Sequence, residues 1–257
     1  MLTIFDSHSH YTDHAFDEDR LELLREFPKK GVIRCMVAAS DIPTAKEGIA
    51  LAEELPELIL TAVGVHPELA NDTPDDYLKT LRELAKHPSV KAIGEIGLDY
   101  HYENFDKSKQ ITIFREQLSL AKELNLPVIL HCRDAMGDML EILHEFAPLD
   151  GVMHCFPGSP EVAQEVLKMG LYIGFTGLIT FQNAKKPLAA LRSVPLERLL
   201  LETDCPYMAP VPYRGKRCDS TMIPETAAVM AREKDVTTEE ILNITAENAA
   251  RLFRVTI

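Results

Sequence analysis

Two histidines near the start of the sequence have the spacing of metal ligands. His8 and His10 lie in the segment DSHSH at positions 6–10. Because side chains two residues apart on a strand point to the same side, both imidazoles could face one point. Imidazole is a common ligand of transition-metal ions. Two solvent-exposed histidines are the simpler interpretation, and the pair by itself does not decide between the two.

A glutamate inside an apolar segment is the second candidate. Glu95 lies in KAIGEIGLDYH, where a carboxylate is costly unless it is paired, protonated or bound to a metal ion. Its two oxygens could bridge two metal ions, and an ordinary salt bridge is the alternative. The neighbouring Gly94 and Gly97 indicate close packing of the backbone at this point.

Two further histidines end apolar runs in consecutive strand–helix units. His131 ends the run PVILH, and His154 ends the run GVMH. One such histidine is more often a core or capping residue, but a pair at equivalent positions favours metal ligation. Cys132 and Cys155 follow them directly and should point to the opposite side of each strand. We therefore expect these thiols to pack rather than to bind metal.

Asp204 ends the apolar run RLLLETD and is a catalytic candidate. A carboxylate at this position could bind a metal ion and accept a proton from water. Glu202 has the same parity and could also face inward. Aspartate often caps a helix, but Pro206 and Pro210 disfavour a helix that starts immediately afterwards.

The elements that must position these residues are short apolar segments separated by stretches of helical period. Near-continuous apolar runs are typical of strands that are buried on both faces of a parallel sheet. Eight strand–helix units in about 250 residues fit a (β/α)8 barrel. The strand candidates are residues 2–6, 32–40, 58–66, 90–97, 127–132, 151–156, 171–177 and 198–204.

An open, doubly wound sheet is the alternative fold, and the positions of the polar candidates argue against it. Barrel enzymes gather their catalytic groups at the carboxyl ends of the strands. We therefore predict one domain over residues 1–257, in which a helix over 237–253 covers the barrel. The candidates that fall at the carboxyl ends of predicted strands are His8, His10, His66, Glu95, His131, His154 and Asp204.

Composition and charge exclude several classes of protein. The formal net charge is −13, whereas a protein that coats a nucleic-acid duplex is normally basic. Charged residues interrupt every apolar run before it could cross a bilayer. The segment MLTIFDSHSH lacks the features of a secretory signal, and the five cysteines have no framework spacing. We therefore expect a cytoplasmic protein with reduced thiols.

Longer motifs give the sequence a family resemblance. It resembles the TatD family of metal-dependent deoxyribonucleases, in the amidohydrolase superfamily. The motifs occur in the family's order and cover nearly the whole chain. The resemblance implies a barrel that holds two divalent metal cations, with Zn, Mn, Mg and Co as candidates. The segments that carry it are DSHSH, GVHP, GEIGLDYHYEN, LPVILHCRDA, GVMHCFPGS, GLYIGFTGLITFQNA and LLLETDCPYMAP…PYRGKR.

The resemblance also implies a role for each candidate. It places His66 of GVHP on the substrate side of the pocket, whereas Glu68 and Cys218 depart from the family pattern. Asp204 and Glu95 are the expected catalytic residues. The implied ligands are His8, His10 and Asp204 for the first metal ion, Glu95 as a bridge, and His131 and His154 for the second.

Basic side chains could hold the phosphates of a polyanionic substrate beside the metal ions. Arg133 follows His131 closely, and the loop PYRGKR contributes Arg214, Lys216 and Arg217. A solvated loop is the alternative for this cluster. The sequence shows no regular stripe of aromatic residues for stacking bases. The candidate loop aromatics are Tyr100, Tyr102, Phe105 and Tyr213.

Three functional hypotheses remain from the sequence. The leading one is a deoxyribonuclease that trims single-stranded DNA from an end, acts as a monomer and holds DNA locally at the metal site. The second keeps the metal ions but hydrolyses an ester or amide in a small molecule or aminoacyl-tRNA. The third is a metal-dependent scaffold, which the nearly complete ligand set disfavours.

Overall fold

The computed structural model describes residues 2–257 and contains one sheet of eight parallel strands. Each strand pairs with the next one in chain order, whereas the order reverses within a doubly wound sheet. The predicted (β/α)8 barrel is confirmed. The strands are β1 (Ile4–Ser9), β2 (Val32–Ala38), β3 (Ile59–Val63), β4 (Val90–Asp99), β5 (Val128–Arg133), β6 (Gly151–Met153), β7 (Tyr172–Phe175) and β8 (Leu199–Leu201).

Backbone hydrogen bonds join the first strand to the segment that follows the last one. The amide of Asp204 donates to the carbonyl of His8 at 3.0 Å, and the amide of His10 donates to the carbonyl of Cys205 at 2.9 Å. Closing the ring in this way brings Asp204 beside His8 and His10, although about 200 residues of chain separate them.

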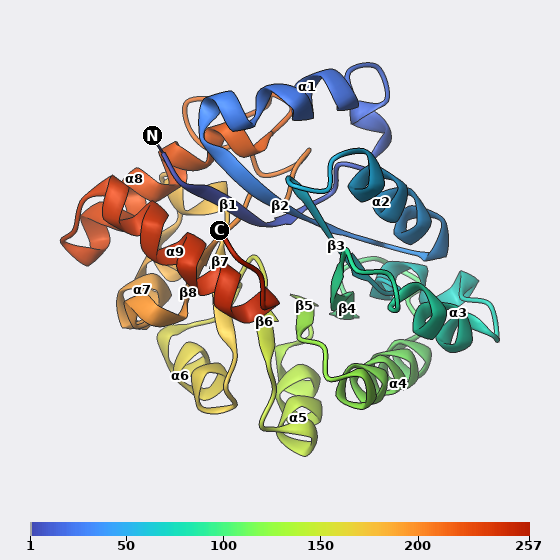
Figure 1. Cartoon of the computed structure of the whole chain (residues 1–257). Coiled ribbons are helices and arrows are strands. Elements are labelled where there is room, and N and C mark those ends of the chain that lie inside the picture. The colour runs from blue at the N-terminus through green and yellow to red at the C-terminus, as the bar shows by residue number, and fades with distance from the viewer. Residues whose placement is uncertain (1) are drawn as a thin grey trace.

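Helices surround the strands and cover the outside of the barrel (Figure 1). Local capping fixes where several of them begin; at α2, for example, the Asp41 carboxylate accepts from the amide of Thr44 at 2.8 Å. Among residues 2–257 there is no helix of the length and apolarity that a membrane span requires. The helices are α1 (Arg20–Glu26), α2 (Ile42–Glu54), α3 (Tyr77–Leu84), α4 (Lys107–Leu124), α5 (Met136–Phe146), α6 (Pro160–Lys168), α7 (Lys185–Ser193), α8 (Ile223–Lys234) and α9 (Thr238–Phe253).

Helix α9 covers the amino-terminal end of the barrel, as the sequence predicts. Leu252 and Phe253 belong to one buried cluster with Phe5, Ile129 and Tyr172, which lie at or near the starts of their strands. The rings of Phe5 and Phe253 have centroids 6.0 Å apart. In Figure 1 this red helix lies across the strands. The carboxyl ends of the strands are thereby left as the accessible mouth.

Asp6 anchors β1 to the segments that follow β8. Its Oδ2 accepts from the hydroxyls of Thr203 at 2.7 Å and Ser220 at 2.6 Å, and its Oδ1 accepts from the amide of Thr203 at 3.0 Å. All three residues are buried. The carboxyl group therefore satisfies three buried donors that have no access to bulk water.

We expect replacement of Asp6 by alanine to lower the free energy of unfolding by about 3–5 kcal/mol, because buried donors would lose their acceptor. Urea unfolding in the presence of a chelator measures the change independently of metal binding. The control is Asp76→Ala, since Asp76 is exposed and makes no side-chain capping bond. Equal stability of the two variants would contradict an anchoring role for Asp6.

Candidate metal centre and active site

Four donor atoms converge near the carboxyl ends of β1 and β8. The Nε2 atoms of His8 and His10 lie 3.0 Å apart. Glu95 Oε2 lies 3.2 Å and 3.4 Å from these nitrogens, and Asp204 Oδ1 lies 3.6 Å and 3.3 Å from them. Ligands at about 2.0–2.1 Å from a tetrahedral metal ion lie about 3.3–3.4 Å apart. The spacing of the His8, His10 and Glu95 donors therefore fits a metal ion, and Asp204 lies beside the two histidines.

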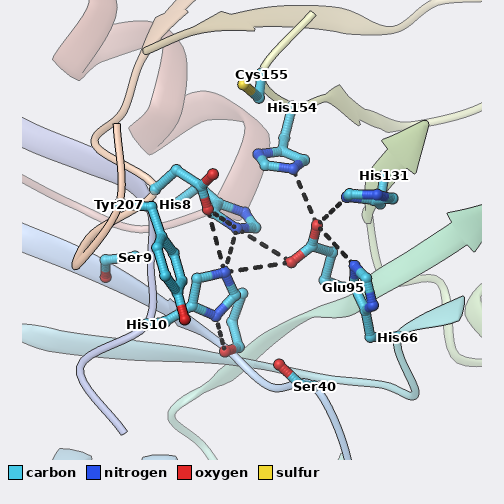
Figure 2. A network of polar contacts seen from close by, with 12 residues as sticks. His8, Ser9, His10, Ser40, His66, Glu95, His131, His154, Cys155 and Tyr207 are labelled. Atoms are coloured by element: carbon cyan, nitrogen blue, oxygen red, sulfur yellow. Dashed lines mark hydrogen bonds and ion pairs between the residues drawn. The ribbon is translucent and has the colours of Figure 1, made fainter. Parts of the chain in front are cut away.

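The second carboxylate oxygen of Glu95 faces three other histidine nitrogens (Figure 2), although the ring of His154 also stacks on that of His8 with centroids 3.9 Å apart. Glu95 Oε1 lies 2.8 Å from Nδ1 of His131, 2.9 Å from Nε2 of His154 and 3.7 Å from Nε2 of His66. The Glu95 side chain is only 3 % exposed. One buried carboxylate thus lies between two groups of histidines, which is the arrangement that a bridging ligand requires.

Glu95 lies in the middle of β4, and the expectation that it ends its strand is wrong. The reason is the length of β4, which continues to Asp99. The amide of Glu95 donates to the carbonyl of Ala39, directly beyond the end of β2, at 3.0 Å. The middle of β4 is therefore level with the ends of shorter strands, and Glu95 still faces the mouth of the barrel.

Two glycines make room for the cluster. Gly97 has a φ of +152°, and a Cβ atom added there would lie 1.9 Å from the carbonyl oxygen of His131. A Cβ atom added to Gly174 would lie 2.4 Å from a carboxylate oxygen of Glu202. Close backbone packing at Gly97, expected from the sequence, is therefore present, and Gly174 makes space for a buried carboxylate.

Acceptors on the outer side orient two of the candidate ligand rings. Nδ1 of His10 lies 3.1 Å from the carbonyl oxygen of Ala38, and Nε2 of His131 lies 3.0 Å from Oδ2 of Asp99. A carbonyl or carboxylate can only accept, so these nitrogens carry the proton of the neutral ring. The opposite nitrogen of each ring then presents a lone pair to the cluster, as in carboxylate–histidine–metal sites.

Glu202 lies on the outer side of His154, but at a longer distance. Its Oε1 lies 3.5 Å from Nδ1 of His154, which is an ion-pair distance rather than a hydrogen bond. Glu202 is fully buried, and Ser7 donates to its other oxygen at 3.3 Å. The inward orientation of Glu202 that the sequence suggests is therefore present. Nδ1 of His8 is buried and has no hydrogen-bond partner among residues 2–257.

His66 carries its proton on the opposite side from these rings. Its Nδ1 accepts from the amide of Glu68 at 3.2 Å, so the proton of the neutral ring is on Nε2, toward Glu95. Burial and the nearby His131 lower the pKa of His66 to about 3, which keeps the ring neutral. A protonated nitrogen cannot bind a metal ion, but it can donate a hydrogen bond to a substrate.

The carboxylates control the charge of the cluster. Burial lowers the pKa of His10, but hydrogen bonds with Asp204 and Glu95 outweigh burial and raise it to about 10. Burial also lowers the pKa of His131, but hydrogen bonds with Asp99 and Glu95 outweigh burial and raise it. His10 therefore binds a proton at neutral pH unless a metal ion displaces it.

We expect metal binding to release protons and to weaken as the pH falls. Because the pKa of His10 is above neutral pH, a metal ion must displace about one proton or more from the cluster at pH 7. Each displaced proton makes the affinity fall about tenfold per pH unit. Calorimetric titration with Zn²⁺ or Mn²⁺ in buffers of different ionisation enthalpy counts the protons. Affinity that stays constant from about pH 6 to pH 9 would contradict this assignment.

Two of the predicted phosphate-binding arginines lie over aromatic rings. The guanidinium of Arg133, at the end of β5, lies 5.2 Å from the ring centroid of Tyr102, and its Nη1 donates to the Tyr102 hydroxyl at 3.2 Å. The guanidinium of Arg214, in the loop after β8, lies 4.6 Å from the ring centroid of Phe181. Both therefore combine a charge with an aromatic surface at the carboxyl side of the barrel.

Arg217 also lies over an aromatic ring, that of Phe16 at 4.7 Å, but its pairing with a carboxylate argues against its expected role in a phosphate-binding cluster. Its guanidinium forms two hydrogen bonds with the Asp19 carboxylate, at 2.7 Å and 2.5 Å, and a third with the carbonyl of Ala15 at 2.8 Å. A guanidinium held by a carboxylate in this way is not available for a phosphate. Lys216 and Arg214 remain as the cations of this loop.

The cysteines lie outside the donor set. Burial raises the pKa of the Cys132 and Cys155 thiols to about 12, so both stay protonated at neutral pH. The Cys155 side chain points away from Glu95 (Figure 2). Cys218, which departs from the family pattern, is 1 % exposed. It therefore packs in the core and presents no surface to a substrate.

Asp99 and Tyr207 are not among the candidates that the sequence indicates. A signal for Asp99 exists, since it shares the parity of Glu95 and Gly97 on one strand. Tyr207 gives no such signal, because it lies in the loop after β8. Its hydroxyl donates to Asp13 at 3.0 Å.

The chain is similar to known proteins over nearly its whole length. The family model described as TatD related DNase matches residues 5–254. An uncharacterized metal-dependent hydrolase of Bacillus subtilis, YabD, is 44% identical, over 98% of this chain and 99% of the relative. The 3'-5' ssDNA/RNA exonuclease TatD of Erwinia tasmaniensis is 33% identical, over 98% of this chain and all of that protein.

Solved structures give the same result. The TatD homologue YJJV of Escherichia coli has a TM-score of 0.92 and 31% identity, and the alignment covers 98% of each chain. A phosphotriesterase homology protein from Escherichia coli has a TM-score of 0.67 at 12% identity and covers 98% of each chain. This second likeness concerns the fold alone.

Proposed function

The chain is a member of the TatD related DNase family, and we propose that it is a two-metal hydrolase that removes nucleotides from an end of single-stranded DNA. The observation that carries the proposal is the position of Glu95, whose two oxygens face different pairs of nitrogen donors. The proposed first site consists of His8, His10 and Asp204, with Glu95 shared. His131 and His154 belong to the second.

The chemistry of the donors bears on which metal ion is bound. Four imidazoles and two carboxylates suit Zn²⁺, Mn²⁺ or Co²⁺ better than Mg²⁺, which prefers oxygen ligands and retains water. Divalent ions held there would lower the pKa of bound water toward about 7 and offset the charge of a phosphodiester.

The chain's own residues supply the rest of the chemistry. Burial opposes ionisation of Asp204, but the adjacent His10 lowers its pKa. Its carboxylate is therefore ionised at neutral pH and can accept a proton from the attacking water. His66 donates from Nε2 to a phosphate oxygen. Arg133, Arg214 and Lys216 hold phosphates farther along the strand.

The experiment that tests this function reloads metal-stripped protein with each candidate ion. Substrates are end-labelled single- and double-stranded DNA, RNA, aminoacyl-tRNA and a generic phosphoester. We expect shortening of single-stranded DNA from one end, dependent on the added metal. The related Erwinia exonuclease TatD is named for 3'-5' action, so the label is placed at each end in turn. Cleavage of an ester in aminoacyl-tRNA, without cleavage of DNA, would instead support the alternative hydrolase.

Replacement of Arg214 by alanine should raise KM for an oligonucleotide and leave kcat nearly unchanged, because the change removes a phosphate contact away from the reacting bond. A small phosphoester that cannot reach this loop should show no change. Arg217→Ala is the comparison, since Arg217 is held by Asp19. If Arg214→Ala leaves the oligonucleotide KM untouched, Arg214 belongs to a solvated loop instead.

A further inference from the structure

A cavity of about 260 Å³ opens beside the second group of donors. Asp99 belongs to both places, because it lines this cavity and its Oδ2 contacts Nε2 of His131 at 3.0 Å. Glu68, two residues after His66, also lines the cavity. A group bound in the cavity is therefore separated from the proposed metal site by about one side chain.

The cavity has an aromatic wall. Tyr102 and Phe105, both from the loop between β4 and α4, line it and are 52 % and 38 % exposed. The ring of Phe105 stacks on Tyr100 with centroids 4.7 Å apart and an interplanar angle of 11°. One face of Phe105 is therefore supported from behind, which suits it to stack against a planar ligand.

The rest of the wall combines carboxylates with the side-chain amides of Asn71, Asn104 and Gln110. The carboxylates of Glu68, Glu103 and Asp106 line the cavity. Asp106 accepts from the amide of Lys109 at 3.0 Å at the start of α4, but no residue within 2–257 forms a hydrogen bond or ion pair with the Glu68 or Glu103 carboxylate. These groups can bind a donor, and they repel a carbonyl or phosphate oxygen.

We propose that this cavity binds the base of the terminal nucleotide and selects bases that carry an exocyclic amino group. Cytosine and adenine present an amino donor where thymine presents a carbonyl acceptor, and carboxylates accept from the amino group of cytosine. The ring of the base stacks on the aromatic wall, and the Glu68 carboxylate accepts a hydrogen bond from the amino group of the base. The phosphate then lies on the side of the cavity that faces the metal-ligand cluster, away from the carboxylates of the cavity wall. This inference rests on the proposed nuclease function.

The test compares oligonucleotides that differ only in the terminal base. Terminal dC and dT form a matched pair, since both are pyrimidines. We expect kcat/KM for dC to exceed that for dT by about tenfold, which is within the discrimination of one good base contact. Glu68→Gln should reduce this ratio to about one to three, because an amide can donate as well as accept. The control is Glu57→Gln, since the Glu57 side chain is 95 % exposed and precedes β3 at the opposite end of the barrel.

A second variant separates stacking from reading of the base edge. Phe105→Ala should raise KM about tenfold for every terminal base and leave the ratio of dC to dT unchanged, since every base has a stacking face. Thermal unfolding and metal content of each variant show whether the fold and the metal site are intact.

Equilibrium binding of dCMP and dTMP to the metal-loaded protein gives a readout that does not depend on cleavage. Preferential binding of dCMP without DNA cleavage would contradict the proposed nuclease and leave the cavity's role standing. Cleavage with equal kcat/KM for dC and dT would overturn the base-selecting cavity and leave the nuclease standing. A ratio that Glu68→Gln does not change would assign any base preference to a different part of the molecule.

Discussion

Replacement of Asp204 by asparagine should lower kcat by about 10²–10⁴-fold, the usual effect of losing a general base, while the chain keeps its fold. Asparagine has nearly the same shape but cannot accept and hold the proton of the attacking water. Loss of a negative ligand beside His8 and His10 should also weaken the first metal ion. The second metal ion should be weakened less, because the Asp204 carboxylate forms its ion pairs with His8 and His10.

Two measurements separate these effects. Metal content by mass spectrometry gives the occupancy of the variant, and kcat is then measured with the metal saturating. A variant that keeps near-full turnover under saturation would show that Asp204 is not the base. Loss of both metal ions would show that the two sites depend on each other more closely than the separate donor groups predict.

Replacement of Glu95 by glutamine should have a larger effect, because one change removes charge from both sites. The Glu95 oxygens lie within 3.4 Å of four histidine nitrogens. An amide has a single oxygen for one metal ion, and its nitrogen would face histidine lone pairs on the other side. We expect binding of both metal ions to weaken. Loss of a general base alone lowers the rate by about 10²–10⁴-fold, and we expect kcat/KM to fall by more than this.

The matched control is Glu202→Gln, which changes a buried carboxylate that orients His154 from outside the donor set. It should weaken the second metal ion by about 10–100-fold, as loss of an outer partner usually does, and leave the first nearly unchanged. A Glu95→Gln variant that still binds two metal ions tightly would contradict a bridging role for Glu95.

The sequence by itself determined which elements form and which side most functional residues face. Apolar runs separated by helical segments predicted the eight strands, and the segment over 237–253 predicted the helix that covers the barrel. These features are local, since strand and helix periodicity depend on neighbouring residues. Parity along a strand placed His8 and His10 on one side, and it placed Glu202 on the same side as Asp204.

The tertiary structure decided which partner each of these residues has. Arg217 and Asp19, 198 residues apart, form an ion pair that removes Arg217 from the expected phosphate-binding cluster. Asp6 meets Ser220 across 214 residues. Period and parity contain no information about such pairs, because they depend on how the barrel closes.

The sequence also contains no information about which ring nitrogen of a histidine carries the proton. A histidine in the sequence has two equivalent nitrogens, and the group that each nitrogen contacts determines which one carries the hydrogen. The Asp99 carboxylate fixes the proton of His131 on the outer side, whereas the amide of Glu68 fixes that of His66 on the inner side. The sequence could therefore identify these two histidines as candidates. The fold assigns one a lone pair and the other a hydrogen-bond donor, because only the fold places their partners.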